Sequence, residues 1–362
     1  MRIAWVVDGR LDQVSGGYLY DRLVIDHLKR HGVDVDVVSL PTGSYGTRLA
    51  QGLRSDVAER IGASGPQLVV EDELSHPGLL RVGRRLARRQ PGLLRVGLVH
   101  HLRSSEPRSP LANLVYRRIE RRYLRSLDAF IFNSRATRGT VQRLGLRSAP
   151  SIVAVPGADR LKPSFTAEAI RRRAVTPGPL RALFVGQMIP RKGLMMLVEA
   201  VALLPSGSVR LEIAGSSEAD SGYARRVRRR VDVLQLDRAV RFLGVLDSQG
   251  LAQAMAEAHV LAVPSSYEGY GMAYLEGMGY GLPAIAGAGG GAKEFLRHEE
   301  NGFLLTDGDP AGLAVILSSL HSDRARLTRL GISARSTYLA HPTWETTGDA
   351  ILTFLAGLIP RA

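Results

Sequence analysis

Short apolar runs alternate with amphipathic stretches along the first half of the chain. Residues 3–7 (IAWVV) and 33–40 (VDVDVVSL) have the pattern of buried strands. The stretch between them, YLYDRLVIDHLKRHG, has helical periodicity and ends at Gly32, a residue that commonly terminates helices. Further strands are predicted in QLVVEDEL, LRVGLVHHL, DAFIFNS and SIVAVPG. This alternation of strands and helices predicts a parallel sheet with helices on both faces.

The same alternation begins again near residue 180. Strands are predicted in RALFVGQ, RLEIAGS, VRFLGVL, AHVLAVPS and LPAIAG. The segment from about 160 to 180 breaks the rhythm with Pro, Gly and a run of Arg, and we interpret it as a linker. We therefore predict an α/β protein with two doubly wound, Rossmann-like domains, 1–165 and 178–342, facing each other across a ligand-binding cleft. A last helix in 343–362 is expected to return to the N-terminal domain.

Composition supports a soluble, globular protein. The 362 residues are 45% apolar and 23% charged, with no apolar run near the roughly 20 residues that span a bilayer. The N-terminal MRIAWVVDG is interpreted as a first strand and not as a signal peptide. There is no cysteine, which excludes disulfides and thiolate catalysis. We expect a cytoplasmic protein, with the inner membrane face as a second expected location.

The positive charge is concentrated in the first half of the chain. The net charge is +14, and residues 1–150 hold 25 Lys and Arg against 14 Asp and Glu. Within this half, LANLVYRRIERRYLRSL (111–127) places Leu111, Val115, Ile119, Tyr123 and Leu127 on one helical face. A stripe on another face consists of Arg117, Arg121 and Arg125, with Arg118 and Arg122 beside it. Two interpretations stay open: a helix on an anionic membrane surface, or a core helix with a solvated basic face. Nucleic-acid binding is not expected, because no recognised module accompanies these arginines.

Two glutamates eight positions apart stand out in residues 264–283, PSSYEGYGMAYLEGMGYGLP. Glu268 follows a predicted strand, and Glu276 lies about two turns into the next helix. Their carboxylates are therefore about 10 Å apart, too far to share a proton. Two interpretations follow: both grip one elongated ligand with paired hydroxyls, or both are solvated surface side chains.

This segment resembles the E-x7-E motif of retaining glycosyltransferases of family 4, which have the GT-B fold. FVGQMIPRKG (184–193) resembles the family's phosphate-binding strand and loop, and SGGYLYDRLVIDHLKRHGVDVDVV its N-terminal glycine loop and helix. RLEIAG, VRFLG and GGGAKEFLRHEENGFLL match later blocks of the C-terminal domain. The resemblance implies transfer of a hexose, with retention, from a nucleoside diphosphate sugar to a hydroxyl acceptor.

The resemblance also implies roles for individual residues. Glu276 should bind the ribose hydroxyls, Glu268 the hexose hydroxyls, and Lys192 the diphosphate. The remaining expected donor contacts are Gly16, Gly17, Gly186, Gln187, Arg191, Val245, Leu246, Gly269, Tyr270, Gly271 and Met272. No Asp-x-Asp motif occupies a suitable loop, so we expect a metal-independent, front-face reaction without a protein nucleophile.

One position departs from the family pattern. Gln187 stands where the family usually has an arginine, so one cation on the leaving diphosphate is missing from its usual place. Arg191, next to Lys192, is the candidate for compensation. This position leaves open one alternative, a catalytically silent subunit that binds a sugar nucleotide and activates a partner. A sugar-nucleotide epimerase of the same fold is the other alternative, although the E-x7-E spacing favours transfer.

Polar residues cluster at the carboxyl ends of two predicted N-terminal strands. Glu71, Asp72, Glu73 and His76 follow one strand, and His100 and His101 follow another. By resemblance, His100 should lie near the donor sugar and act in catalysis with Glu268 and Lys192. Asp72, His76 and His101 are the candidates on the acceptor side. A metal site on His100 and His101 is rejected, because neighbouring residues of a strand point to opposite faces.

Overall fold

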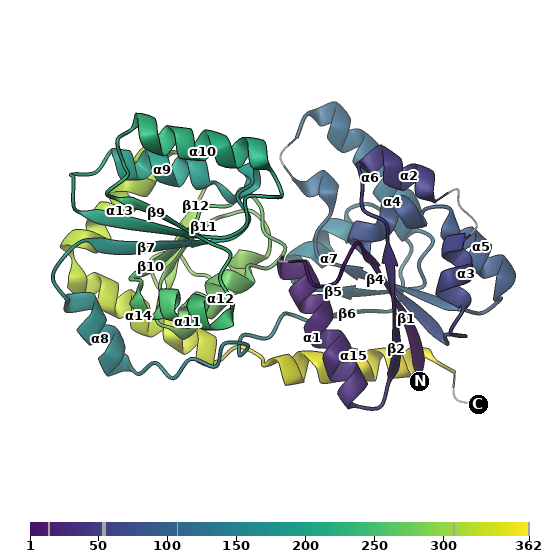
Figure 1. The fold of residues 1–362 in the computed structure, drawn as a ribbon. Coiled ribbons are helices and arrows are strands. Elements are labelled where there is room, and N and C mark those ends of the chain that lie inside the picture. The colour runs from purple at the N-terminus through teal and green to yellow at the C-terminus, as the bar shows by residue number, and fades with distance from the viewer. Residues whose placement is uncertain (14, 53–55, 107, 307, 361–362) are drawn as a thin grey trace. The chain divides into compact units, whose positions relative to one another are not determined.

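The computed structural model describes residues 1–13, 15–52, 56–106, 108–306 and 308–360, which form two compact units. The N-terminal unit comprises Met1–Gly157 and Pro342–Ala362, and the C-terminal unit comprises Ala158–His341. Each unit contains a six-stranded sheet in which all paired strands are parallel (Figure 1). The predicted α/β class with two Rossmann-like sheets is confirmed.

The N-terminal sheet has the strand order β2-β1-β3-β4-β5-β6. Its strands are β1 Arg2–Asp8, β2 Asp34–Leu40, β3 Leu68–Asp72, β4 Leu94–Val99, β5 Ala129–Phe132 and β6 Ser151–Val153. The chain reverses direction across the sheet between β1 and β3, which are neighbours. Ligands of open α/β sheets bind beyond the carboxyl strand ends at such a switch point.

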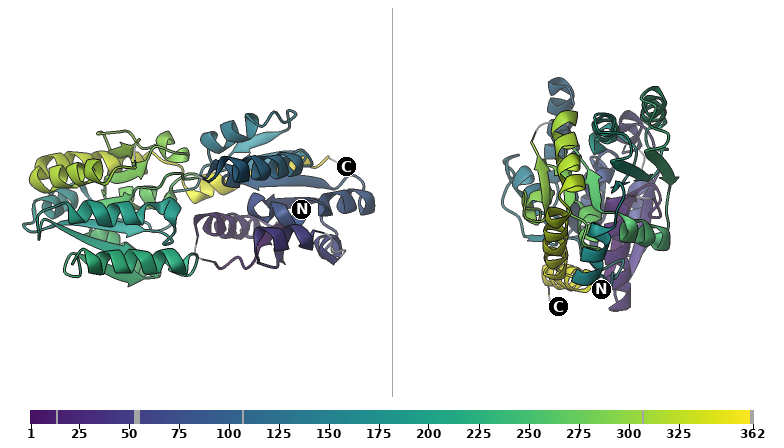
Figure 2. Two further views of the ribbon diagram at one scale, coloured as in Figure 1. Left: turned by 90° about the horizontal axis from the view of Figure 1, so that it is seen from above. Right: turned by 90° about the vertical axis from the view of Figure 1, so that its left-hand side faces the viewer.

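Helices cover both faces of this sheet (Figures 1 and 2). They are α1 Gly16–Arg30, α2 Tyr45–Gln51, α3 Asp56–Gly62, α4 His76–Leu79, α5 Val82–Arg89, α6 Pro110–Leu124, α7 Arg135–Gln142 and α15 Trp344–Leu358, with short 3-10 turns η1 Glu73–Ser75 and η2 Arg103–Ser105. Alternate residues of β1 enter two separate cores. Ala4 and Val6 join the core under α3, α5, α6 and α7, whereas Ile3 and Trp5 join the core under α1 and α15. This alternation follows from the two-residue period of a strand.

The last helix, α15, belongs to the N-terminal unit and lies beside α1 (Figure 1). Its Ile351 and Leu355 are fully buried in the same core as Leu28 of α1. Gly157 makes the return of the chain possible, because a Cβ at this position would lie 2.2 Å from the backbone nitrogen of Trp344.

The C-terminal sheet has the strand order β12-β11-β10-β7-β8-β9, with its switch point between β7 and β10. Its strands are β7 Leu180–Val185, β8 Val209–Ala214, β9 Val240–Gly244, β10 Val260–Val263, β11 Ala284–Gly287 and β12 Gly302–Leu305. Every residue of β10 and β11 is buried, as expected for central parallel strands covered on both faces. The four-residue strand β12 is not among the predicted strands.

Helices also lie on both faces of the C-terminal sheet (Figure 2). They are α8 Ala167–Val175, α9 Leu194–Ala202, α10 Ser221–Val233, α11 Ser248–Glu257, α12 Met272–Gly279, α13 Pro310–Ser322 and α14 Arg324–Leu339, with 3-10 turns η3 Pro190–Lys192 and η4 Gly291–Glu294. The segment that we interpret as a linker differs from that expectation. It contains α8, and Arg335 of α14 donates hydrogen bonds to the Pro163 and Phe165 carbonyls, so the segment is folded into this unit.

Helix α6 differs from the predicted amphipathic helix. It ends at Leu124, so Leu127 lies beyond it, and Tyr123 and Leu127 are buried whereas Leu111 and Val115 are 78% and 54% exposed. The C-terminal part of the predicted apolar face is therefore buried in the core, whereas its N-terminal part is exposed. In the described part of the chain, no helix combines the length and the hydropathy that crossing a bilayer requires.

Candidate functional site

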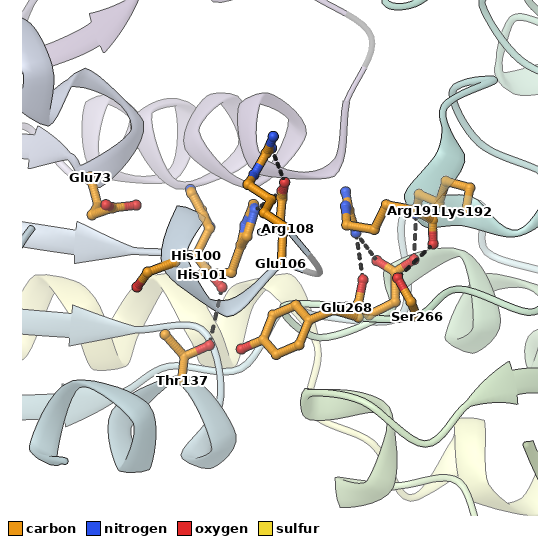
Figure 3. A network of polar contacts seen from close by, with 12 residues as sticks. Glu73, His100, His101, Glu106, Arg108, Thr137, Arg191, Lys192, Ser266 and Glu268 are labelled. Atoms are coloured by element: carbon orange, nitrogen blue, oxygen red, sulfur yellow. Dashed lines mark hydrogen bonds and ion pairs between the residues drawn. The ribbon is translucent and has the colours of Figure 1, made fainter. Parts of the chain in front are cut away.

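An ion pair lies at the switch point of the C-terminal sheet, where β7 and β10 end. Lys192, in the turn after β7, donates a 2.5 Å hydrogen bond from Nζ to Oε1 of Glu268, in the loop after β10 (Figure 3). Ser265 Oγ donates to the same oxygen at 2.6 Å, and Arg191 lies 3.6 Å from Oε2. Glu268 is only 8% exposed, so its charge is compensated almost entirely by these three side chains.

Burial and charge act in opposite directions on this pair. Burial alone would raise the pKa of Glu268, but the positive charges of Lys192 and Arg191 lower it to about 2. Burial lowers the pKa of Lys192, and Glu268 limits that decrease. Glu268 is therefore a carboxylate at neutral pH, which can accept hydrogen bonds but cannot donate a proton.

Glycines let three loops meet around Glu268. Gly193 has φ 70°, and a Cβ there would lie 2.3 Å from the Pro264 carbonyl oxygen. On the other side, Glu268 donates its backbone N–H to the Gly289 carbonyl, and its own carbonyl accepts from Gly291 N–H. A Cβ on Gly290 would lie 1.9 Å from the Glu268 oxygen. The turn that carries Glu268 is thus fixed through its backbone by the glycine-rich segment 287–291.

Glu276 lies in the second turn of α12 and is 7% exposed. Arg160 donates from Nε to Oε1 of Glu276 at 2.6 Å and from Nη1 to Ser248 Oγ at 3.2 Å. The helix begins after Gly271, whose φ of 104° and close approach to Tyr274 exclude a larger residue. Both glutamates of the motif therefore have a basic partner within the same unit.

The other predicted donor residues lie around the same strand ends. Gly186 follows β7 at φ 155°, and a Cβ on Gly215 would lie 1.8 Å from its carbonyl oxygen. Gln187 is half-buried beside it, and Arg191 donates to the Tyr267 carbonyl. The other predicted residues are located by their elements. Val245 and Leu246 follow β9, with Val245 54% exposed, and Gly269 and Met272 flank Gly271 at the start of α12. Tyr270 is buried and packs against Phe295 and His341.

His100 is the centre of a buried polar group at the switch point of the N-terminal sheet. Its Nε2 lies 3.1 Å from Oδ1 of Asp21 in α1, and its carbonyl accepts from Thr137 Oγ1 (Figure 3). Gly17 borders the ring, since a Cβ there would lie 3.3 Å from His100 Cδ2, and Gly16 begins α1 one residue earlier. Burial would lower the pKa of His100, but the Asp21 hydrogen bond and the nearby carboxylates raise it.

Asp72 lies close to His100 at the end of β3. Ligand atoms of Asp21, Asp72 and His100 are all within 4.8 Å of one another. Burial and then the charge of Asp21 raise the pKa of Asp72 well above its usual value. The Oδ2 atoms of Asp21 and Asp72 are both buried and have no hydrogen-bond partner among the described residues. The group could hold a small cation or share a proton.

The remaining acceptor-side candidates lie farther along the same strand ends. His76 is 3% exposed, and its Nδ1 donates a 2.8 Å hydrogen bond to the Glu73 carbonyl. Its Nε2 lies 2.8 Å from Tyr45 Oη. It forms a second group of possible metal ligands with Glu73 and Glu120. Burial and the charge of Glu73 raise the pKa of Glu120 to about 7.

His101 is placed apart from this group. Its Nε2 lies 3.1 Å from Glu106 Oε1, and Glu106 also pairs with Arg108 (Figure 3).

Among the residues of these sites that were not predicted are Asp21, Arg160 and Ser265. Asp21 could have been found, because it is a carboxylate on the face of α1 that otherwise buries Tyr18, Val24 and Leu28. No sequence pattern of this kind indicates Arg160 or Ser265. Arg160 is 116 residues from Glu276 in sequence, and only the fold brings the two together.

Comparison with solved structures identifies the fold. The chain aligns over 99% of its length with 98% of a sucrose-phosphate synthase from Thermosynechococcus elongatus, with a TM-score of 0.83 and 24% identity. It also aligns over 98% of its length with 99% of the Anabaena protein HepE solved with UDP and glucose, with a TM-score of 0.77 and 20% identity. The chain therefore has the GT-B fold that the sequence motifs imply.

Sequence comparison finds a family match in the C-terminal unit. Residues 179–323 match the family Glycosyl transferases group 1. A D-inositol 3-phosphate glycosyltransferase of Nocardia farcinica is 31% identical over 55% of this chain and 46% of its own length. The lipopolysaccharide core glycosyltransferase LpsE of Rhizobium meliloti is 27% identical over 65% of this chain and 66% of its own length. The chain thus spans about half of the length of curated relatives such as the Nocardia protein.

Proposed function

We propose that the chain is a retaining glycosyltransferase that moves a hexose from a nucleoside diphosphate sugar to a hydroxyl acceptor. The observation that carries this proposal is the buried Lys192–Glu268 pair at the β7–β10 switch point. Such a pair offers a cation for a diphosphate and a carboxylate for sugar hydroxyls at the position where α/β sheets bind ligands. The names of the relatives, which are glycosyltransferases, agree with this assignment.

Lys192 is the proposed electrostatic catalyst. An ammonium group has three N–H donors, so Nζ can keep its bond to Glu268 and still contact a diphosphate. The charge on the leaving diphosphate would then be stabilised in a buried site, where such interactions are stronger than in water. Arg191 is the proposed second cation, in place of the arginine that Gln187 replaces.

Glu268 and Glu276 are the proposed contacts to the two sugars of the donor. With its pKa near 2, Glu268 stays ionised and accepts hydrogen bonds from the hexose hydroxyls. Glu276, held by Arg160, would accept from the ribose hydroxyls. We assign neither as a proton donor or nucleophile, and the departing diphosphate would take the proton of the acceptor hydroxyl. In the N-terminal unit, His100 is the proposed catalytic residue near the donor sugar, and the proposed acceptor-side residues are Asp72, His76 and His101.

A thermal-shift screen of UDP-, GDP- and ADP-sugars tests donor binding, because a ligand of the folded state raises the melting temperature. Sugars of one of these three nucleotides should raise the melting temperature of the wild type, and they should raise that of Glu276→Gln by a smaller amount. If no nucleotide sugar shifts the melting temperature, the donor assignment is wrong. If one binds but is never cleaved, the silent binding subunit is the better description.

We also propose that α6 rests on an anionic membrane surface. Leu111, Leu114 and Val115 are 78%, 48% and 54% exposed on its first two turns. Helical spacing places Arg118, Arg122 and Arg125 along the same side, and all three are exposed. An exposed apolar patch continued by cations suits insertion below anionic headgroups. Sedimentation with phosphatidylglycerol vesicles should occur and should be reduced in Leu111→Ser/Val115→Ser, whereas no sedimentation at low salt would remove this proposal.

A further inference from the structure

Two histidines at the C-terminal end of α1, His27 in its last turn and His31 at its C-cap, face two acidic residues of α15 on the surface of the N-terminal unit. His27 and His31 are four residues apart, and so are Glu345 and Asp349, so each pair occupies one face of its helix. Ligand atoms of all four side chains lie within 4.8 Å of one another. The two helices are neighbours within this unit (Figure 1).

Hydrogen bonds fix which nitrogen of each imidazole is available. Nε2 of His27 lies 3.0 Å from Asp349 Oδ1, and Nδ1 of His31 lies 2.9 Å from the His27 carbonyl oxygen. Carboxylate and carbonyl oxygens only accept hydrogen bonds, so the ring protons are on these two nitrogens. In the neutral rings, the lone pairs are then on His27 Nδ1 and His31 Nε2.

Both of these atoms face the same carboxylate. His27 Nδ1 lies 3.4 Å from Glu345 Oε2, and His31 Nε2 lies 3.8 Å from Glu345 Oε1. His27 Nδ1 is buried and has no hydrogen-bond partner among the described residues. Ligands about 2.0–2.1 Å from a tetrahedral zinc ion are about 3.3 Å apart, and the ion lies in the plane of each imidazole. The partly exposed His31 ring would therefore have to rotate out of its stack on His27 to share the ion.

Packing holds His27 in this orientation. Gly348 of α15 lies under the ring, and a Cβ there would be 2.3 Å from His27 Cγ. The ring can therefore lie between Glu345 and Asp349 only because this position is glycine. The rings of His27 and His31 are stacked, with centroids 4.2 Å apart.

We propose that His27, His31 and Glu345 bind one divalent transition-metal ion, with zinc as the expected ion, and that Asp349 orients His27. Two histidines and one carboxylate form a known zinc ligand set, and a ligating histidine usually donates its other N–H to a carboxylate or carbonyl. Bound metal would join the C-terminal helix to α1. This role is separate from the proposed transferase chemistry and does not depend on it.

Isothermal titration of the untagged, EDTA-treated full chain with Zn²⁺ tests the site. We expect one zinc per chain and a higher melting temperature with zinc. His31→Ala and Glu345→Gln, at exposed positions, should each weaken binding at least about tenfold, and Asp349→Ala should weaken it about 10–100-fold. Arg30→Gln is the matched control. Arg30 lies 3.7 Å from Glu345 but is no ligand, so its loss should leave zinc affinity unchanged or increase it.

Cobalt substitution gives a second readout, because the visible absorption of Co²⁺ reports its coordination. The wild type should show the intense bands of a four- or five-coordinate ion, and His31→Ala should lose them. The proposal is overturned if the wild type binds no stoichiometric zinc. It is equally overturned if His31→Ala and Glu345→Gln bind zinc as the wild type does, which would place the ion elsewhere.

Discussion

Lys192 and Glu268 are 76 residues apart in the sequence, yet they form one buried ion pair with a 2.5 Å hydrogen bond between Nζ and Oε1. The pair exists because β7 and β10, which precede these residues, are neighbours in the sheet. The pair places an ammonium group and a carboxylate at the strand ends, where a ligand can contact either group.

Replacing Lys192 tests its proposed role on the leaving diphosphate. Lys192→Ala should lower kcat for donor cleavage by about 10²–10³-fold, the usual cost of losing one group that stabilises transition-state charge. Lys293→Ala is the matched control, because Lys293 is one of only four lysines and is exposed. Steady-state kinetics with the donor found by the thermal-shift screen would measure both. Equal kcat in the two variants would contradict the role of Lys192.

The depressed pKa of Glu268 predicts a loss of stability in acid. The folded-state pKa of about 2 lies below the usual 4.5, so the ionised form stabilises the fold. This contribution, on the order of 3 kcal/mol, is complete above about pH 4.5 and is lost as the pH falls towards 2. Urea unfolding of wild type and Glu268→Gln should show a difference in unfolding free energy that shrinks between pH 4.5 and 3. For the exposed Glu299→Gln, a pH-dependent difference of the same size would mean that the effect is not specific to Glu268.

Arg160 is predicted to act on donor binding more than on the chemical step. It holds Glu276, which we assign to the ribose, so its loss should weaken ground-state and transition-state binding together. Arg160→Ala should therefore raise KM for the donor about tenfold, with a smaller change in kcat. Arg171→Ala, an exposed arginine of the same unit, is the control. A decrease in kcat at unchanged KM would contradict the assignment of Glu276 to the ribose.

Asp21 is predicted to control the protonation of His100. The hydrogen bond from His100 Nε2 and the charge of Asp21 raise the pKa of His100 against the effect of burial. NMR titration should show a lower His100 midpoint in Asp21→Asn than in the wild type, while the His298 and His321 resonances of the C-terminal unit report any global change.

The same raised pKa sets the pH dependence of stability. Protonated His100 stabilises the fold below about pH 6.5, and this contribution is lost as the pH rises through the folded-state pKa of His100. The stability difference between wild type and Asp21→Asn should therefore be larger at pH 6 than at pH 8.5. An unchanged His100 midpoint in Asp21→Asn would exclude this coupling.

The sequence predicts much of the fold because the buried parallel strands are uninterrupted apolar runs. All six strands of the N-terminal sheet and five of the C-terminal sheet lie within or overlap predicted ranges. The strand β12 is not predicted because its short apolar run directly follows the polar residues 297–301, whereas the equally short β5, β10 and β11 lie in clearer apolar runs. Helix α8 was missed because its Arg run resembles a solvated linker, although Ile170 and Ala174 bury its inner face.

The residues of the candidate sites also divide into those that local sequence motifs indicate and those that only the fold brings together. Lys192 and Glu268 belong to local motifs, and the structure places them together, while their roles stay predictions. The Arg160–Glu276 contact and the pairing of His27 and His31 with Glu345 join segments far apart in sequence, and no local pattern indicates them. Asp21 is the intermediate case, since a charge on the buried face of a helix was visible in the sequence but its partner was not.

The most direct test of the central claim is release of nucleoside diphosphate from a nucleotide sugar by the purified full chain, with and without a panel of hydroxyl acceptors. We expect release from the donor that shifts the melting temperature, at a rate about 10²-fold or more above that of Lys192→Ala. If the wild type binds that donor but releases no more diphosphate than Lys192→Ala with any acceptor, the chain is not the transferase proposed.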